Sequence, residues 1–321
     1  MSLVEVRHLS RRFGPVEAVR DVSFSFDKGQ VFGFIGPNGA GKTTTMRILA
    51  GLDEPSGGDC RIDGLSTVDD ADRVARRVGY MPDDFGTYPN MTVGEYLDFF
   101  ARAYGLRSPR RERALAEVID FCQLGGLVDK PVTALSKGMR QRLGLGRTLV
   151  HDPDVLILDE PAAGLDPRAR VELRELIRLL ARQGKAVLIS SHILADLQEI
   201  CDAVAILELG RVVASGAVKD IKRQVQHQVD AKARETGQRA LVELRLAAPV
   251  PRFASILAEQ AEVSDVDLHE LAAAFQAPAD PAAQAALLAR LVAAGLPVCH
   301  FASRDTNLED LFMHLTEGKV Q

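Results

Sequence analysis

The fold of this chain is decided by one glycine-rich stretch, Gly36-Pro37-Asn38-Gly39-Ala40-Gly41-Lys42-Thr43-Thr44. The stretch satisfies the pattern Gly-x-x-x-x-Gly-Lys-Ser/Thr. It follows an apolar run that predicts a buried strand, residues 30–35, and it leads into a predicted helix. Because glycine allows positive φ angles and close approach of the backbone, N–H groups of the loop and of the helix start can point at phosphate oxygens. The flanking strand and helix favour a nucleotide-phosphate site over a glycine-rich turn that matches by chance.

Charged and hydroxyl side chains around this loop have predicted chemical roles. Lys42 would pair with the β- and γ-phosphates, and the Thr43 hydroxyl would bind Mg²⁺. A second apolar run, residues 155–158, ends in Asp159 and Glu160, as expected of a buried parallel strand that carries acids to the phosphate end of a sheet. We expect Asp159 to hold Mg²⁺ through water. Glu160, on the other side of the strand axis, would act as general base on a water in line with the γ-phosphate.

Residues 135–142 read Leu-Ser-Lys-Gly-Met-Arg-Gln-Arg, and Ser136 can cap a helix that follows. Together with the motifs above, this segment makes the chain resemble the ATP-binding cassette family. The resemblance implies an α/β P-loop NTPase fold with a parallel core sheet, an antiparallel β layer and a helical subdomain. It also identifies the family signature, whose Ser136, Gly138 and helix N-terminus close over the γ-phosphate bound by the opposite subunit of a head-to-tail dimer. Lys137 and Met139 depart from the usual Leu-Ser-Gly-Gly-Gln.

The same resemblance assigns roles to residues outside these segments. Asp166 lies in the loop that crosses the family's dimer interface, and His192 resembles the switch histidine that contacts the γ-phosphate. Phe13 occupies the place of an aromatic ring that stacks on adenine, and Val19 that of an apolar contact to the base and ribose. The alternatives are an ordinary surface or core role for His192 and core packing for Phe13. All of residues 36–44 would bind the nucleotide, and the implied ligands are ATP and Mg²⁺.

Residue 83 departs from the family pattern at a position that should contact Mg²⁺. The family carries a glutamine there, between the helical and catalytic subdomains, whereas this chain has Asp83. A carboxylate can still approach Mg²⁺, but when ionised it only accepts hydrogen bonds and cannot donate one to the γ-phosphate or the attacking water. We therefore expect Asp83 to be a weaker or altered Mg²⁺ sensor.

The composition disfavours several classes of protein. The 321 residues are 46% apolar and carry a net charge of −5, which fits two domains with cores of their own and disfavours nucleic acid as a partner. The four cysteines are far apart and lack Cys-x-x-Cys spacing, which disfavours a zinc site or a disulfide framework and fits a reducing cytoplasm. The longest apolar runs have the length of strands, so we expect no membrane span, and any pore to belong to another chain.

Two domains and a linker are expected. Residues 1–222 hold every motif above and form the predicted ATP-binding domain. Its helical subdomain, at about 87–134, is rich in aromatic residues, which would receive the membrane partner or pack the subdomain itself. Residues 223–239 are polar and predict a linker.

Residues 240–321 predict a small α+β domain at the end of the chain. Alternating apolar residues predict strands at 241–246 and 297–301, and Asp280-Pro281 predicts the start of a helix between them. Thr306 and Glu309 form a capping box for a last helix. The segment resembles the accessory domain of exporter-type cassettes, with an expected role in dimer support or regulation.

The sequence therefore predicts the ATP-hydrolysing subunit of an ATP-binding cassette transporter, with export as the favoured direction. The chain would form a homodimer in the ATP state and bind a separately encoded integral membrane permease, which would hold it at the cytoplasmic face of the cell membrane. One alternative is a cassette protein that remodels DNA or ribosomes, for which coiled coils, zinc modules or basic surfaces would be expected. The other is a regulatory protein that binds ATP without turnover, against which Glu160 argues.

Overall fold

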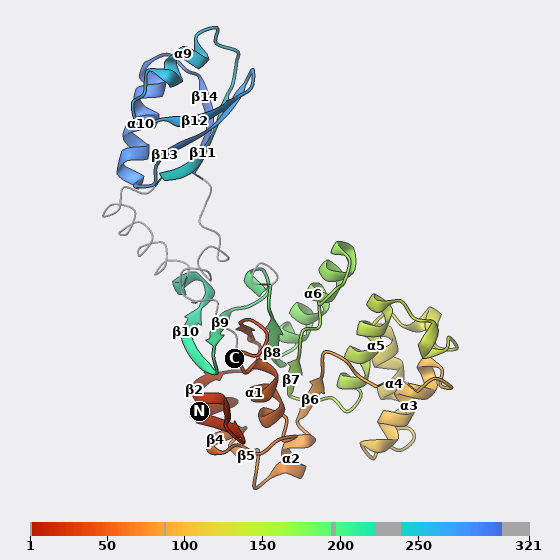
Figure 1. The fold of residues 1–321 in the computed structure, drawn as a ribbon. Coiled ribbons are helices and arrows are strands. Elements are labelled where there is room, and N and C mark those ends of the chain that lie inside the picture. The colour runs from red at the N-terminus through yellow and green to blue at the C-terminus, as the bar shows by residue number, and fades with distance from the viewer. Residues whose placement is uncertain (1, 87, 194–196, 222–238, 304–321) are drawn as a thin grey trace. The chain divides into compact units, whose positions relative to one another are not determined.

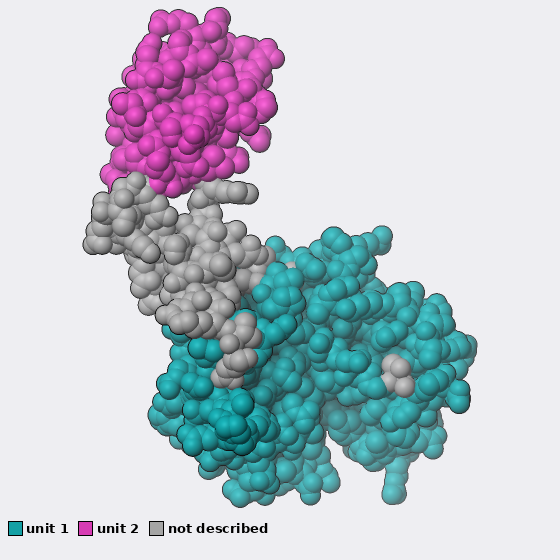
Figure 2. Space-filling view, in the orientation of Figure 1, with its two compact units in different colours: residues 1–218, 313–321 teal, residues 219–312 magenta. Residues whose placement is uncertain are grey.

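The computed structural model of this chain describes residues 2–86, 88–193, 197–221 and 239–303. Contacts divide the chain into two compact units, one built on residues 1–218 and one on residues 219–312 (Figure 2). The domain boundaries expected at 222 and 239 stay predictions. Nearly all of the predicted linker, and the capping box of Thr306 and Glu309, lie outside the described residues.

A six-stranded sheet forms the centre of the first unit (Figure 1). Its order is β10-β9-β3-β8-β7-β6, and neighbouring strands run parallel except for β10, which is antiparallel to β9. The strands are β3 (Val31–Ile35), β6 (Val78–Met81), β7 (Val155–Leu158), β8 (Ala186–Ser191), β9 (Ala203–Glu208) and β10 (Arg211–Ala217). Every residue of β3, β7 and β8 is buried, because both faces of a parallel sheet are covered. The parallel core predicted from the apolar runs is confirmed.

An antiparallel sheet of four strands lies against this core and confirms the predicted second β layer. Its order is β2-β1-β4-β5, with β1 (Val4–Phe13), β2 (Val16–Phe26), β4 (Gly57–Ile62) and β5 (Leu65–Ser66). Aromatic rings join the two sheets. Phe24 of β2 stacks on Phe32 of β3 with ring centroids 5.3 Å apart and meets Phe34 edge-on at 4.9 Å. Such pairs stabilise a core beyond the area that they bury.

The helices of the catalytic part are α1 (Lys42–Leu49), α2 (Ala71–Ala75) and α6 (Pro167–Arg182). Helix α6 begins with Asp166 as its cap and a proline in its first turn, a combination favoured at helix starts. Its apolar residues are buried in part only, since Ile177 is fully buried whereas Val171 is 48% exposed and Leu179 38% exposed. No helix in the described part of the chain is long and apolar enough to cross a membrane.

The predicted helical insertion contains α3 (Val93–Ala103) and α4 (Arg110–Phe121), followed by two short 3₁₀ turns, and α5 (Lys137–Leu149) packs against both helices. A full capping box of Thr92 and Glu95 starts α3. Gly144 lets α5 approach the Phe85 ring, since a Cβ at this position would lie 2.5 Å from Phe85 Cε1. The loop that carries Asp83 is thereby packed directly onto α5.

The second unit has the order β-α-β-β-α-β and an antiparallel sheet β12-β13-β11-β14. Its elements are β11 (Arg239–Leu246), α9 (Phe253–Ala258), β12 (Ser264–Leu268), β13 (Ala272–Pro278), α10 (Pro281–Ala293) and β14 (Val298–Ser303). This is the ferredoxin-like arrangement. Alternate residues of β11 and β13 pack with both helices in a core of their own, and Phe275 lies at its centre, fully buried. The analysis of the sequence found β11, α10 and β14 but missed α9, β12 and β13.

Candidate active site

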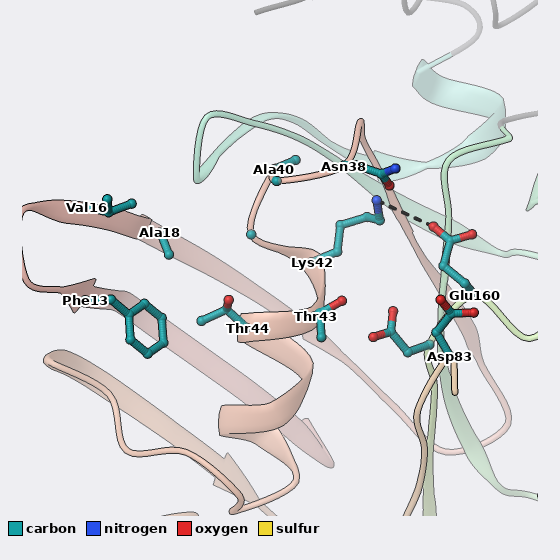
Figure 3. Close-up of a pocket in the computed structure, with 13 residues that line it drawn as sticks. Phe13, Val16, Ala18, Asn38, Ala40, Lys42, Thr43, Thr44, Asp83 and Glu160 are labelled. Carbon is teal, nitrogen blue, oxygen red and sulfur yellow. Dashed lines mark ion pairs between the residues drawn. The ribbon is translucent and has the colours of Figure 1, made fainter. Parts of the chain in front are cut away.

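The predicted phosphate loop lines a cavity of about 490 Å³ at the start of α1 (Figure 3). Strand β2, the loop after β6 and the end of β7 supply the other walls. Most of the predicted site residues meet here, together with two that were not predicted, Val16 and Ala18. The lining residues are Phe13, Val16, Ala18, Asn38, Gly39, Ala40, Gly41, Lys42, Thr43, Thr44, Asp83, Asp159 and Glu160. Gly36 and Pro37 lie at the start of the loop and take part through their carbonyl groups, as described below.

Two glycines of the loop are required by their surroundings. A Cβ on Gly36 would overlap the carbonyl oxygen of Leu207 in β9, so the loop can leave β3 here only without a side chain. Gly41 has a φ of 96° and caps α1, and a Cβ there would lie 2.5 Å from the carbonyl oxygen of Ala18. Positive φ and close backbone contact are both properties that glycine tolerates. The loop is therefore fixed against strands β2 and β9.

Lys42 crosses the cavity from the first turn of α1. Its Nζ donates to the carbonyl oxygens of Gly36 at 2.7 Å and Pro37 at 3.2 Å, and it lies 3.5 Å from Glu160 Oε1. The side chain is 6% exposed, and this burial lowers the pKa of the ammonium, while Glu160 and Asp159 act in the opposite direction. A buried ammonium that is held by two carbonyl groups and one ion-paired carboxylate is well placed to bind an incoming anion.

Glu160 is held in a strained backbone conformation. Its φ is 46°, which is uncommon for a residue with a side chain and costs on the order of 1–3 kcal/mol. Its N–H donates to Ser190 Oγ at 2.8 Å, and that hydroxyl donates to Asp159 Oδ1 at 2.6 Å. His192 Nδ1 lies 2.8 Å from Glu160 Oε2. The Glu160 carboxylate is thus fixed between Lys42 and His192.

Ser190 is a site residue that analysis of the sequence missed. It is fully buried at the end of β8, and it orients both acids at the end of β7 through one hydroxyl group. The signal was present in the sequence, since the apolar run of residues 186–189 ends in two serines directly before His192. A hydroxyl in a buried parallel strand needs a polar partner, and the neighbouring strand end supplies it.

Three side chains offer oxygen ligands for Mg²⁺, namely the exposed Thr43 hydroxyl and the carboxylates of Asp159 and Asp83. Burial, and after it the nearby carboxylates of Asp159 and Glu160, raise the pKa of Asp83. Oxygen ligands of this kind fit Mg²⁺, which takes one or two carboxylates and completes its shell with water and phosphate oxygens. Within the described residues, no three His, Cys, Asp or Glu side chains form a ready-made metal site. The oxygen atoms of Thr43, Asp159 and Asp83 therefore fit a Mg²⁺ ion that binds together with a nucleotide.

The predicted base contacts are placed differently by the structure. Phe13 is 47% exposed and lines the cavity, with the guanidinium carbon of Arg11 4.6 Å from its ring centroid. Val19 is fully buried in the hydrophobic core and is not among the residues that line the cavity, so its contact with the base and ribose stays a prediction. Because side chains alternate along a strand, Val19 points inward while its neighbour Ala18 faces the cavity.

Ser136, Gly138 and Asp166 do not line this cavity. Ser136 caps α5 by accepting a hydrogen bond from the Met139 N–H at 3.3 Å, as predicted, and Asp166 caps α6. A Cβ on Gly138 would meet only Ala169 Cβ, at an ordinary contact distance of 3.4 Å. Nothing in the described residues of the same chain therefore requires glycine at position 138.

Comparison with known proteins agrees with this geometry. A family model described as ABC transporter matches residues 19–163. The chain is 36% identical to the Nod factor export ATP-binding protein I of Ralstonia nicotianae, over 99% of this chain and 95% of that protein. It is 40% identical to the ABC transporter ATP-binding protein NatA of Bacillus subtilis, over 68% of this chain and 91% of that protein.

A solved structure described as the ATP binding subunit of an ABC transporter is 34% identical, with a TM-score of 0.64, and the match covers 74% of this chain and 100% of that one. The resemblance inferred from residues 36–44 and 135–142 is confirmed. The chain belongs to the ATP-binding cassette family and is an ATP-hydrolysing subunit of an ABC transporter.

Proposed function

We propose that this chain drives export through a separate membrane permease, as a homodimer that encloses two Mg²⁺-bound ATP molecules between its subunits. The observation that carries the proposal is the fixed position of Glu160 between Lys42 and His192 at the phosphate end of the cavity. Export is supported by relatives that cover nearly the whole chain. These are named Nod factor export ATP-binding protein I and linearmycin resistance ATP-binding protein LnrL.

Each charged group of the site has a separate task in hydrolysis. Lys42 would exchange its carbonyl partners for β- and γ-phosphate oxygens, which are stronger acceptors because they are charged. Thr43, Asp159 and Asp83 would hold Mg²⁺, which neutralises charge that develops on the phosphates. Glu160 would take the proton of the attacking water. His192 holds the Glu160 carboxylate through its Nδ1, and it can bind the γ-phosphate as the family's switch histidine does.

The dimer is supported by groups that do not line the phosphate site of their own chain. Ser136, Gly138 and the start of α5 lie away from the chain's own cavity, although a helix N-terminus favours an anion. Gly138 leaves room for a close approach that nothing in the described part of the chain uses. A two-fold dimer would bring both signature segments to both phosphate sites, because its interface is self-complementary. Asp166 would lie in the same interface.

Contact with the permease is assigned to the aromatic part of the helical insertion. Tyr88, Phe99 and Tyr104 are between 42% and 47% exposed, whereas Tyr96 is fully buried and Phe85 nearly so. The expectation that some of these rings pack the subdomain and others stay available for a partner is consistent with this division. A permease bound here would hold the chain at the cytoplasmic face of the membrane.

The test compares ATP hydrolysis by the parent chain with hydrolysis by Glu160→Gln. General base catalysis contributes about 10²- to 10⁴-fold, so we expect a loss of that size, together with an ATP-dependent dimer of the variant in size-exclusion chromatography. The matched control is Glu175→Gln, which removes an exposed carboxylate paired with Arg178 on α6 and should leave turnover unchanged. Parent and Glu160→Gln chains that bind ATP equally and never hydrolyse it, even beside the permease, would refute hydrolysis and favour the regulatory binder.

A further inference from the structure

Lys137 is the first residue of α5, directly after the Ser136 cap. The first turn of this helix contains no acidic residue. A cation at a helix N-terminus is unfavourable because the positive end of the helix dipole lies there. Helix stability therefore does not explain a lysine at this position, and a different contact must be considered.

The side chain of Lys137 lies over Gly164, in the loop that leads from Glu160 to α6. A Cβ on Gly164 would be 3.4 Å from Lys137 Cε, 3.7 Å from its Cδ and in collision with its Nζ. Gly164 also has a φ of 64°, a conformation that disfavours a side chain. The loop is tightly turned, since Ala163 N–H donates to the Glu160 carbonyl at 3.0 Å. Lys137 thus covers the loop that starts at the general base.

The charge of Lys137 also acts on Asp83. Among the charged groups that act on the Asp83 carboxylate, Asp159, Glu160 and Asp84 are acidic, and Lys137 supplies the opposing positive charge. Lys137 and Asp83 are two of the three departures from the family pattern, and the charge of Lys137 acts on Asp83.

We propose that Lys137 is a positioning residue for ATP hydrolysis, which fixes the loop between Glu160 and Asp166 over Gly164 and balances the acid at position 83. The proposal rests on the proposed function. It connects two of the departures from the family pattern, because the positive charge at position 137 acts on the negative charge at position 83. It also connects the start of the signature helix, which would serve the partner's ATP, with the general base of its own subunit.

The test measures kcat and KM for ATP, and the dependence of the rate on Mg²⁺ concentration, in three single variants and their combinations. Lys137→Met keeps the length of the side chain without its charge, Gly164→Ala displaces the lysine, and Asp83→Asn removes the facing charge. Because a small misplacement of reacting groups can cost up to about 10²-fold, we expect Lys137→Met to lower kcat about tenfold. KM for ATP should stay within about twofold, since the phosphate loop is untouched, and Lys137→Arg should restore most of the loss.

The kcat values of the double variants distinguish this positioning role from a general effect on stability. Lys137→Met should add little to Gly164→Ala or to Asp83→Asn, because each partner variant already breaks the same unit. Lys28→Met, which removes an exposed lysine 3.8 Å from Asp154, is the matched control and should match the parent. The proposal is overturned if the parent hydrolyses ATP but Lys137→Met equals it, or if the effects of the variants simply add. A parent without turnover, alone and beside the permease, would instead overturn the proposed function, and the role of Lys137 with it.

Discussion

The stacking of Arg11 on Phe13 gives a quantitative prediction about nucleotide affinity. Phe13 is 47% exposed, and one face of its ring lies under the Arg11 guanidinium at 4.6 Å while the ring lines the cavity. An exposed ring keeps one orientation only if something holds it. We expect Arg11 to hold the Phe13 ring ready for the base, so that replacing Arg11 weakens ATP binding without slowing hydrolysis at saturation.

The expected losses of ATP affinity follow from the typical energies of base stacking and of an exposed cation–π pair. A base stacked on an aromatic side chain contributes about 1–3 kcal/mol, so Phe13→Ala should weaken ATP binding about 5- to 150-fold. A cation–π pair at an exposed site contributes only about 0.5–1 kcal/mol. Arg11→Met should therefore weaken binding about two- to fivefold. In the Phe13→Ala background, Arg11→Met should have no further effect, because there is no ring left to hold.

The assay is equilibrium competition of unlabelled ATP against a ribose-labelled fluorescent analogue. All variants carry Glu160→Gln, so that the nucleotide is not consumed. Arg12→Met is the matched control, because it removes the same charge one residue away, where the guanidinium is paired with Glu17 at 2.9 Å. Equal losses in Arg11→Met and Arg12→Met would show an effect of overall charge. That result, or an Arg11→Met effect that persists without Phe13, would refute the reasoning.

Three further predictions concern stability and reactivity. Cys60 and Cys122 are buried, which raises the pKa of each thiol to about 12, and burial also raises the pKa of the Cys201 thiol, whereas Cys299 is exposed. A thiol reagent should therefore titrate one cysteine in the native chain and all four in denaturant, and fast labelling of more than one native thiol would contradict the packing. Phe275→Ala should destabilise the second unit by about 3–5 kcal/mol and speed its proteolysis, because it empties the centre of that core, while the ATP affinity of the first unit stays unchanged. The His151 ring stacks on Tyr104 with ring centroids 3.7 Å apart, and burial lowers the pKa of His151 below the usual 6.5. The unfolded chain therefore binds the proton more readily than the folded chain, and the free energy of unfolding falls as the pH drops below about 6.5. In thermal unfolding between pH 7.5 and 5.5, His151→Phe should lose less stability than the parent, and equal losses would count against this assignment.

The sequence predicts those parts of the first unit that local rules determine. The phosphate loop is bounded by glycines that no other residue can replace, and the apolar runs of β3, β7 and β8 are long enough to be buried on both faces. The starts of α5 and α10 are also local, since each is capped by a side-chain oxygen next to the first turn. These features were found because they need no knowledge of distant contacts.

The missed elements depend on distant contacts instead. Strand β13 consists largely of alanine and lacks the β-branched residues typical of strands, so only its pairing with β11 makes it extended. Helix α9 has only six residues, too few for a clear periodic pattern. The burial of Val19 could not be predicted for a similar reason, because the direction in which a strand residue points follows from the register of the whole sheet.

The charges of the site lead to one last argument about its ligand. Asp83, Asp159 and Glu160 gather at the phosphate end of a cavity in which Lys42 is the nearest cation, and Lys137 approaches from the far side of the loop. Three carboxylates would repel a triphosphate that entered alone, whatever the glycine loop contributed. A divalent cation that arrives with the phosphates reverses this balance, since it is attracted by the same carboxylates that disfavour the nucleotide. The arrangement therefore supports Mg²⁺-bound ATP as the species that this site accepts, and it predicts that ATP affinity falls steeply when Mg²⁺ is chelated.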